Sequence, residues 1–167
     1  MHTYEISSTS DHEVLARLSN FTKREFIFRG VPCNSIEGIL QALKCSDWDT
    51  QKQLCLLSGK EAKKAGEIYL WQDEENLYWE GEIFPRHSRK YQELITEIFD
   101  AAYRGDTTFM DDLLEVEDIL LAHSIGNPDA RQTVLTEVEF LFQIYRLGRY
   151  ALENFAELST ELMGHSL

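Results

Sequence analysis

The stretch that most constrains this chain's fold is residues 32–44, Pro-Cys-Asn-Ser-Ile-Glu-Gly-Ile-Leu-Gln-Ala-Leu-Lys. Its proline ends any preceding extended segment, and Asn34 or Ser35 can then cap a helix. Three aliphatic residues follow at helical spacing and form one apolar stripe: Ile36, Leu40 and Leu43. This periodicity predicts a helix packed against a core.

A line of polar side chains runs beside that stripe at the same spacing: Glu37, Gln41 and Lys44. The spacing places a carboxylate, an amide and an ammonium together along one edge of the buried face. One interpretation is an ordinary amphipathic helix with a Glu–Lys pair on its surface. The other is that the three side chains converge on a ligand.

The length of 167 residues predicts one domain with one sizeable core. An apolar content of 43% is typical of a globular protein. No apolar run approaches the length of a membrane span, and the N-terminus does not resemble a signal peptide, so we expect a cytoplasmic protein without membrane contact. Cys33, Cys45 and Cys55 lack paired metal-ligand spacing, so we expect reduced, structural thiols and no metal site.

The formal net charge of −13 argues against tight binding to bulk nucleic acid, because an acidic surface repels the phosphate backbone. A small anionic ligand remains compatible with a locally basic pocket. The one dense basic run, residues 85–90, includes Arg86 and precedes a predicted helix at 91–103. Such a run is either a solvated face or, at a helix N-terminus, an anion site.

Residues 68–84 predict a hairpin with strands at 68–71 and 77–79 joined by a polar turn at 72–76. Its aromatic side chains either cover the core or make Trp71 or Trp79 a stacking wall for a base. Further along, we expect a helix at 109–116, a buried strand at 119–122 and a last helix opened by a capping box at Thr136 and Glu139. The predicted class is α+β, predominantly helical, with a small sheet.

The order of several motifs between about residues 17 and 150 resembles that of the NADAR family, also called YbiA-like. The motifs are Ser19-Asn20-Phe21, the Glu37/Gln41/Lys44 helix, Ala62 with Gly66, the helix 89–103 and the turn 123–129. The resemblance implies a YbiA-like domain at 13–150 with an inserted hairpin. Residues 1–12 are polar and predict a loose segment, and residues 151–167, beyond the resemblance, are expected to form a C-terminal helical extension.

The sequence departs from the family pattern at two places. The family carries a tryptophan before the helix 89–103, and here that position corresponds to His87 by helix register or to Trp79 by residue type. The family also has a glycine-rich loop after the carboxylate that matches Asp129, where this chain has Ala130-Arg131-Gln132-Thr133. The second departure alters the loop that often cradles the ligand in the family.

The resemblance implies hydrolysis of the N-glycosidic bond of a phosphoriboside, without a cofactor. The substrate would be an ADP-ribose derivative such as ADP-ribosyl guanine, or a riboflavin-pathway intermediate. Glu37 is then the expected catalytic carboxylate and Asp129 a second one, because glycoside hydrolysis commonly uses two. The expected substrate-binding residues are Lys44 and Arg86 for phosphate, Asn20 and Gln41 for the base, and Phe21, Trp79 and His87 around them.

Two other classes of function stay open. The chain can be a non-catalytic module that binds an ADP-ribose- or NAD-derived ligand, although such a module has no need of the Glu37 carboxylate. It can also be a plain protein-interaction domain, in which case the polar line on the first helix is ordinary surface.

Overall fold

The computed structural model describes residues 2–165. The helices are α1 (Glu13–Arg17), α2 (Ile36–Ala42), α3 (Trp48–Leu54), α4 (Gly59–Gly66), the 3₁₀ helix η1 (Trp71–Asp73), α5 (Arg89–Gly105), α6 (Thr107–Glu115) and α7 (Glu137–Gly164). The strands are β1 (Tyr4–Glu5), β2 (Phe26–Phe28), β3 (Val31–Cys33), β4 (Asn76–Trp79), β5 (Glu82–Pro85) and β6 (Leu121–Ala122). The predicted α+β, predominantly helical class is confirmed.

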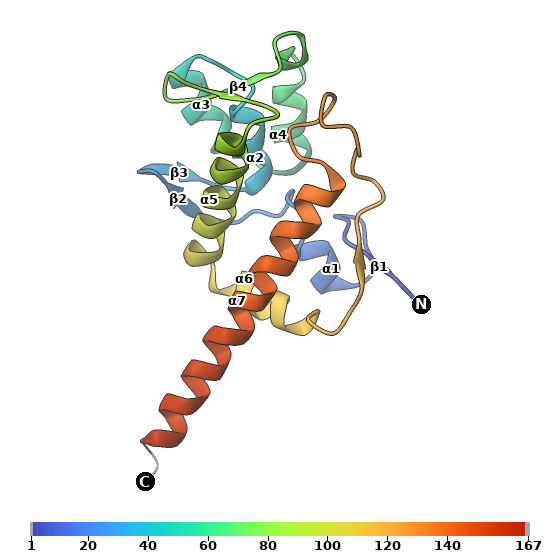
Figure 1. The fold of residues 1–167 in the computed structure, drawn as a ribbon, viewed down its shortest axis with the longest axis vertical. Helices are drawn as coiled ribbons and strands as arrows, with labels where there is room; N and C mark the ends of the chain where they lie inside the picture. Colours follow the sequence, from blue (N-terminus) through green and yellow to red (C-terminus); the bar gives the residue numbers. More distant parts are fainter. Residues whose placement is uncertain (1, 166–167) are drawn as a thin grey trace.

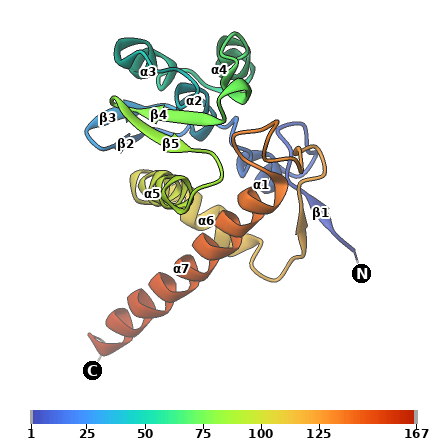
Figure 2. The same ribbon diagram turned by 45° about the horizontal axis from the view of Figure 1, so that its top comes forward.

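The strands form three separate pairs around the helices. Strands β2–β3 and β4–β5 are antiparallel hairpins, and β1 pairs with β6 in parallel. In Figure 1, α2, α3, α4 and the β4–β5 hairpin form one end of the molecule, and α1, α6 and α7 form the other, with α5 between them. Figure 2 shows α7 crossing beside α5 and α6. One continuous apolar core joins these elements.

Helix α2 begins as predicted but is more buried than its sequence pattern indicates. The Ser35 hydroxyl caps it by accepting a hydrogen bond from the Gly38 amide. All residues of α2 are buried, including Glu37 and Gln41. A Cβ on Gly38 would lie 2.6 Å from the Leu57 carbonyl oxygen, so glycine allows the chain after α3 to close over the helix.

A hairpin is present in the predicted region, but the predicted second strand is its first strand. The strands are β4 and β5, whereas residues 68–70 are irregular and Trp71 begins η1. Glu80 and Gly81 connect the strands with φ values of 47° and 80°. Two successive left-handed residues are typical of a type I′ turn, which matches the twist of a tight hairpin. The turn therefore sets the register, and the predicted strand at 68–71 is wrong.

The N-terminal segment was predicted to be loose, but the structure holds part of it in place. Tyr4 and Glu5 pair with Leu121 and Ala122, and Ile6 is completely buried. These contacts hold β1 against β6, the strand that precedes the loop at 123–135. This end of the chain thereby helps to position that loop.

The predicted capping box opens α7, with Thr136 and Glu139 each bonding the other's backbone amide. The helix then runs unbroken to Gly164, so the expected boundary between residues 150 and 151 falls inside one helix. Its second half projects from the body in Figure 1. No helix among residues 2–165 is both long and apolar enough to cross a bilayer.

Candidate active site

A pocket of about 390 Å³ lies between the α2–α4 pair and the loop at 123–135. This volume is within the range of small-ligand sites. One wall carries Asn20, Phe21, Glu37, Leu40, Gln41, Lys44, Lys63 and Glu67. The other carries His123, Ile125, Gly126, Asn127, Gln132, Thr133, Val134, Leu135 and Phe140, with Ser8 and Ser19 at the edge.

Glu37 is the buried carboxylate of the pocket. Its backbone amide donates to the Asn20 carbonyl oxygen at 3.0 Å, which ties the Ser19-Asn20-Phe21 segment to the start of α2. Its Oε1 accepts a hydrogen bond from Gln41 Nε2 at 2.7 Å. Burial raises the pKa of Glu37, while the Gln41 hydrogen bond and the charges of Lys44, Lys63 and His123 oppose that rise. Such a carboxylate is more basic than a solvated one and still favoured as an anion by its neighbours.

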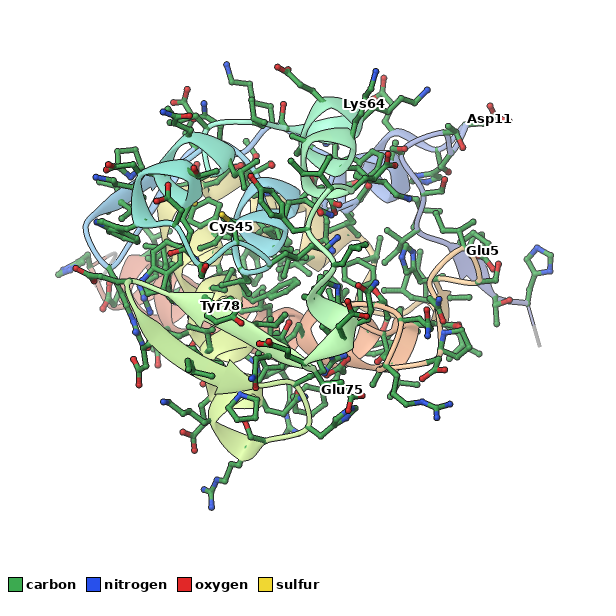
Figure 3. All side chains as sticks on the ribbon, turned by 90° about the horizontal axis from the view of Figure 1, so that it is seen from above. Glu5, Asp11, Cys45, Lys64, Glu75 and Tyr78 are labelled. Atoms are coloured by element: carbon green, nitrogen blue, oxygen red, sulfur yellow. The ribbon has the colours of Figure 1, made fainter. Side chains whose placement is uncertain are left out.

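Two lysines line the pocket and balance the charges of Glu37 and Glu67 there, in a protein that is acidic as a whole. Lys44 extends from the end of α2 and Lys63 from α4. Burial lowers the pKa of Lys44. The negative charge of Glu37 opposes this shift, and the positive charge of Lys63 adds to it. Lys64, the next residue on α4, points outward in Figure 3 and does not line the pocket. The spacing along α4 thus separates one pocket lysine from one surface lysine.

The glycine at the end of α4 gives Gln41 its place. A Cβ on Gly66 would lie 1.9 Å from Gln41 Oε1, so only glycine lets α4 approach this side chain so closely. Gln41 Oε1 and Asn20 Oδ1 are buried and have no hydrogen-bond partner among the described residues. Unpaired buried acceptors are rare, and at a pocket they indicate places where a ligand can donate hydrogen bonds.

His123 stands on the opposite wall. Its Nδ1 lies 2.9 Å from the Ile6 carbonyl oxygen. A carbonyl only accepts, so Nδ1 carries the hydrogen and Nε2 is the basic nitrogen of the neutral ring. The ring packs against Phe140 with the centroids 4.6 Å apart. A group that can accept or donate a proton is therefore fixed across the pocket from the α2 wall.

Five of the expected site residues meet in this pocket: Asn20, Phe21, Glu37, Gln41 and Lys44. Sequence reasoning missed Lys63, Glu67 and His123 as site residues. His123 lies within a motif that carried the family resemblance, and that motif was the available signal. Lys63 follows Ala62 of another such motif, but nothing local distinguishes it from Lys64.

Arg86 does not line the pocket, which corrects the expected phosphate contact. Its side chain is 1% exposed and binds both carboxylate oxygens of Glu139, with Nη1 to Oε2 at 3.1 Å. Its Nε also donates to the Thr133 carbonyl oxygen at 3.0 Å. These contacts occupy the guanidinium and tie β5 to the start of α7. Arg86 is thus a buried structural ion-pair partner.

Trp79 is likewise not a wall for a base. It is 1% exposed and packs edge-on against Phe28 and Trp48, with centroids 5.1 Å and 5.3 Å away. Trp71 is also buried in the core. The alternative that these aromatic residues cover the core is the correct one.

His87 and Asp129 lie outside the pocket lining. His87 is exposed and contacts Glu75 at 3.0 Å. Asp129 binds Arg131 at 3.2 Å, and this hydrogen bond lowers the pKa of Asp129. Asn127 and Gln132 line the pocket from the same loop, and Glu67 supplies its second carboxylate. Among residues 2–165 no three His, Cys, Asp or Glu side chains are grouped as a metal site.

Comparison with known proteins identifies relatives over most of the chain. The family model described as "Bacteriophage protein GP30.3" matches residues 13–148. An uncharacterized 17.1 kDa protein from the Gp30–rIII intergenic region of Enterobacteria phage T4 is 35% identical over 126 residues, which is 74% of this chain and 83% of the phage protein. The NMR structure of the E. coli protein YbiA superimposes with a TM-score of 0.54 and 15% identity, covering 96% of this chain and 90% of YbiA. The predicted YbiA-like fold is confirmed.

Proposed function

Since the chain belongs to the bacteriophage GP30.3 protein family and has the fold of YbiA, we propose that it hydrolyses the N-glycosidic bond of a phosphoriboside. Suitable substrates are an ADP-ribose derivative, such as ADP-ribosyl guanine, or a phosphorylated riboflavin-pathway intermediate. The observation that carries the proposal is the pairing of buried Glu37 with Gln41 beside Lys44 and Lys63 in one pocket. A carboxylate and cations in one site match the needs of a phosphorylated sugar.

Glu37 is the proposed centre of the chemistry. Cleavage of the ribose–nitrogen bond develops positive charge on the sugar, as in glycosidases generally, and a nearby carboxylate stabilises it. Water then adds to the anomeric carbon, and Glu37 takes the proton that this water loses. The raised basicity of the buried carboxylate suits this second role.

The leaving base departs with the bonding electron pair and needs a proton on its nitrogen. His123 faces the pocket from the wall opposite α2 and can supply that proton when its ring is charged. The proton later returns to His123 from Glu37 through water, which restores both groups. The fixed Nδ1 contact to Ile6 leaves Nε2 as the nitrogen that exchanges the proton.

Lys44 and Lys63 are the proposed phosphate contacts, in place of the expected Arg86. Charge-assisted hydrogen bonds to phosphate are stronger than neutral ones, and partial burial of Lys44 strengthens them further. The free acceptors Gln41 Oε1 and Asn20 Oδ1 suit ribose hydroxyls or base amino groups. Phe21, half-buried at the pocket edge, offers an apolar contact to the base.

The test is incubation of the full chain with ADP-ribosylated guanosine, NAD and phosphorylated riboflavin intermediates, followed by mass spectrometry. Hydrolysis gives a free base and a sugar phosphate whose combined mass exceeds the substrate by one water. The proposal requires that product from at least one compound, in EDTA as well as without it. A ligand that is bound but recovered whole would instead show a binding module, and no binding of any compound would refute both.

A further inference from the structure

The second half of α7 leaves the body of the protein (Figures 1 and 2). Ala151 is its last buried residue, and residues 152–165 are exposed except for half-buried Ser159. The family match ends at residue 148, before this projection. The packed first half of α7 nucleates this projection, but the exposed turns beyond Ala151 gain little tertiary packing from the body, so packing from outside the body would stabilise them.

One face of the projection is apolar. Its exposed side chains recur at intervals of three and four residues: Leu152, Phe155, Leu158 and Leu162. Phe155 is 56% exposed, and it is the side chains together, as one contiguous exposed apolar surface, that mark an interaction site. Glu153, Glu157 and Glu161 recur every four residues on the other side of the helix. We call the four apolar residues the α7 stripe.

A groove of about 280 Å³ lies at the base of the projection, between α6 and α7. Its apolar lining includes Leu113, Val116, Leu121, Ile144 and Leu152. Gly148 also lines it, and a Cβ there would meet nothing within 4 Å. Leu152 belongs to both the groove and the α7 stripe, so the two form one continuous apolar surface.

We propose that the α7 projections of two copies of this chain pack against each other, antiparallel, to form a homodimer. This inference is independent of the proposed function. An apolar stripe spaced by three and four residues is the pattern by which two helices interlock. The antiparallel arrangement keeps the two bodies at opposite ends and brings each helix tip toward the groove of the other copy.

A twofold axis near Phe155 makes the surfaces self-complementary. The Phe155 rings then meet at the axis, and Leu152 of each copy opposes Leu158 of the other, at the rim of the groove. Burying the stripe and groove removes on the order of 1,000 Å² from water, the lower limit for a specific interface, so we expect a weak dimer.

The charge of the projection argues against a lipid surface as the occupant. Residues 150–164 contain three glutamates and no lysine or arginine. Helices that lie on anionic membranes are rich in lysine and arginine on their polar face. An acidic outer face is instead compatible with a solvated dimer whose apolar faces meet.

Sedimentation velocity of the full chain tests the association, at concentrations up to about 200 µM to suit a weak interface. We expect a monomer–dimer equilibrium that Phe155→Glu weakens by about ten-fold or more. Glu157→Lys changes charge on the solvated face and should leave the equilibrium within a few-fold. Both residues are exposed, so circular dichroism should show a folded protein for each variant. A parent chain that stays monomeric, or a dimer that Phe155→Glu leaves intact, overturns the proposal.

Disulfide trapping tests the geometry. The native Cys33, Cys45 and Cys55 are buried, so a cysteine added to the projection is the accessible one. Phe155→Cys should form a dimer under mild oxidation, and Glu157→Cys should not. Leu152→Cys should trap poorly, because Leu152 faces Leu158 of the other copy. Efficient trapping at both 152 and 155 would show a parallel pair and refute the antiparallel arrangement.

Discussion

Gly66→Ala tests whether close approach of α4 to α2 builds the pocket. The new Cβ would lie 1.9 Å from Gln41 Oε1, 2.7 Å from its Cδ and 2.9 Å from its Cβ. Rotation of the flexible amide can relieve the shortest contact, but only by giving up the 2.7 Å hydrogen bond to Glu37. The remaining contact with the Gln41 Cβ also requires the two helices to separate slightly.

The expected cost combines opposing terms. Overpacking a close contact costs about 1–3 kcal/mol, and a lost hydrogen bond to a charged group costs about 1.5–3 kcal/mol. The higher helix propensity of alanine stabilises the variant by at most about 1 kcal/mol, and by less at the helix end. A net loss of about 3 kcal/mol should lower Tm by about 6–12 °C in a domain of this size.

Gly148→Ala is the matched control, because nothing lies within 4 Å of its Cβ position in the half-buried middle of α7. It should stabilise the chain by about 0.5–1 kcal/mol, measured in dilute solution where association is negligible. The measurements are the Tm of both variants and the ligand affinity of Gly66→Ala. A Gly66→Ala protein as stable as the parent, with unchanged affinity, would refute the role given to this contact.

Three further predictions concern charged residues. In urea titration, Arg86→Ala should cost about 3–5 kcal/mol of stability, because it leaves the half-buried Glu139 without its partner. Arg89→Ala, which breaks an exposed pair, should cost less than about 1 kcal/mol. Burial opposes ionisation of Glu139, but hydrogen bonds from Arg86 and Gln92 lower its pKa to about 2. The stability that ionised Glu139 contributes should therefore be fully present above about pH 4.5 and be lost as the pH falls toward 2. Glu139→Gln should flatten that loss. Lys44→Ala should weaken phosphoriboside binding by about 10- to 100-fold in calorimetry while Lys64→Ala has little effect, and equal affinities would remove Lys44 from the phosphate site.

Local patterns predicted the elements that local interactions determine. The cap at Ser35 and the capping box at Thr136 and Glu139 involve residues three apart, so the sequence contains both partners together. The hairpin register depended on a turn at Glu80 and Gly81, and the alternative strand at 68–71 contained equally apolar residues. The choice between them depends on which side chains the core buries, which the local pattern does not specify.

The lining of the candidate pocket was predictable where one helix carries it and not where the fold assembles it. Glu37, Gln41 and Lys44 lie on α2 and its end, so their spacing sufficed. Arg86 looked like a basic rim residue because its partner Glu139 is 53 positions away. His123 reaches the pocket through the pairing of β6 with β1 and through Ile6, a contact 117 positions apart. Such long-range contacts arise only from the packed fold.

Glu37→Gln, measured in a single-turnover assay, tests the proposed mechanism most directly. Glutamine keeps the size and helix propensity of glutamate, and burying a neutral amide avoids the cost that raises the pKa of Glu37, so Tm should change little. The amide cannot take a proton from water or stabilise a cationic sugar, so turnover should fall by about 10²-fold or more with affinity nearly unchanged. Glu61→Gln, on the exposed first turn of α4, is the matched control and should turn over like the parent. A folded Glu37→Gln protein that cleaves the same phosphoriboside within a few-fold of the parent rate would contradict the mechanism.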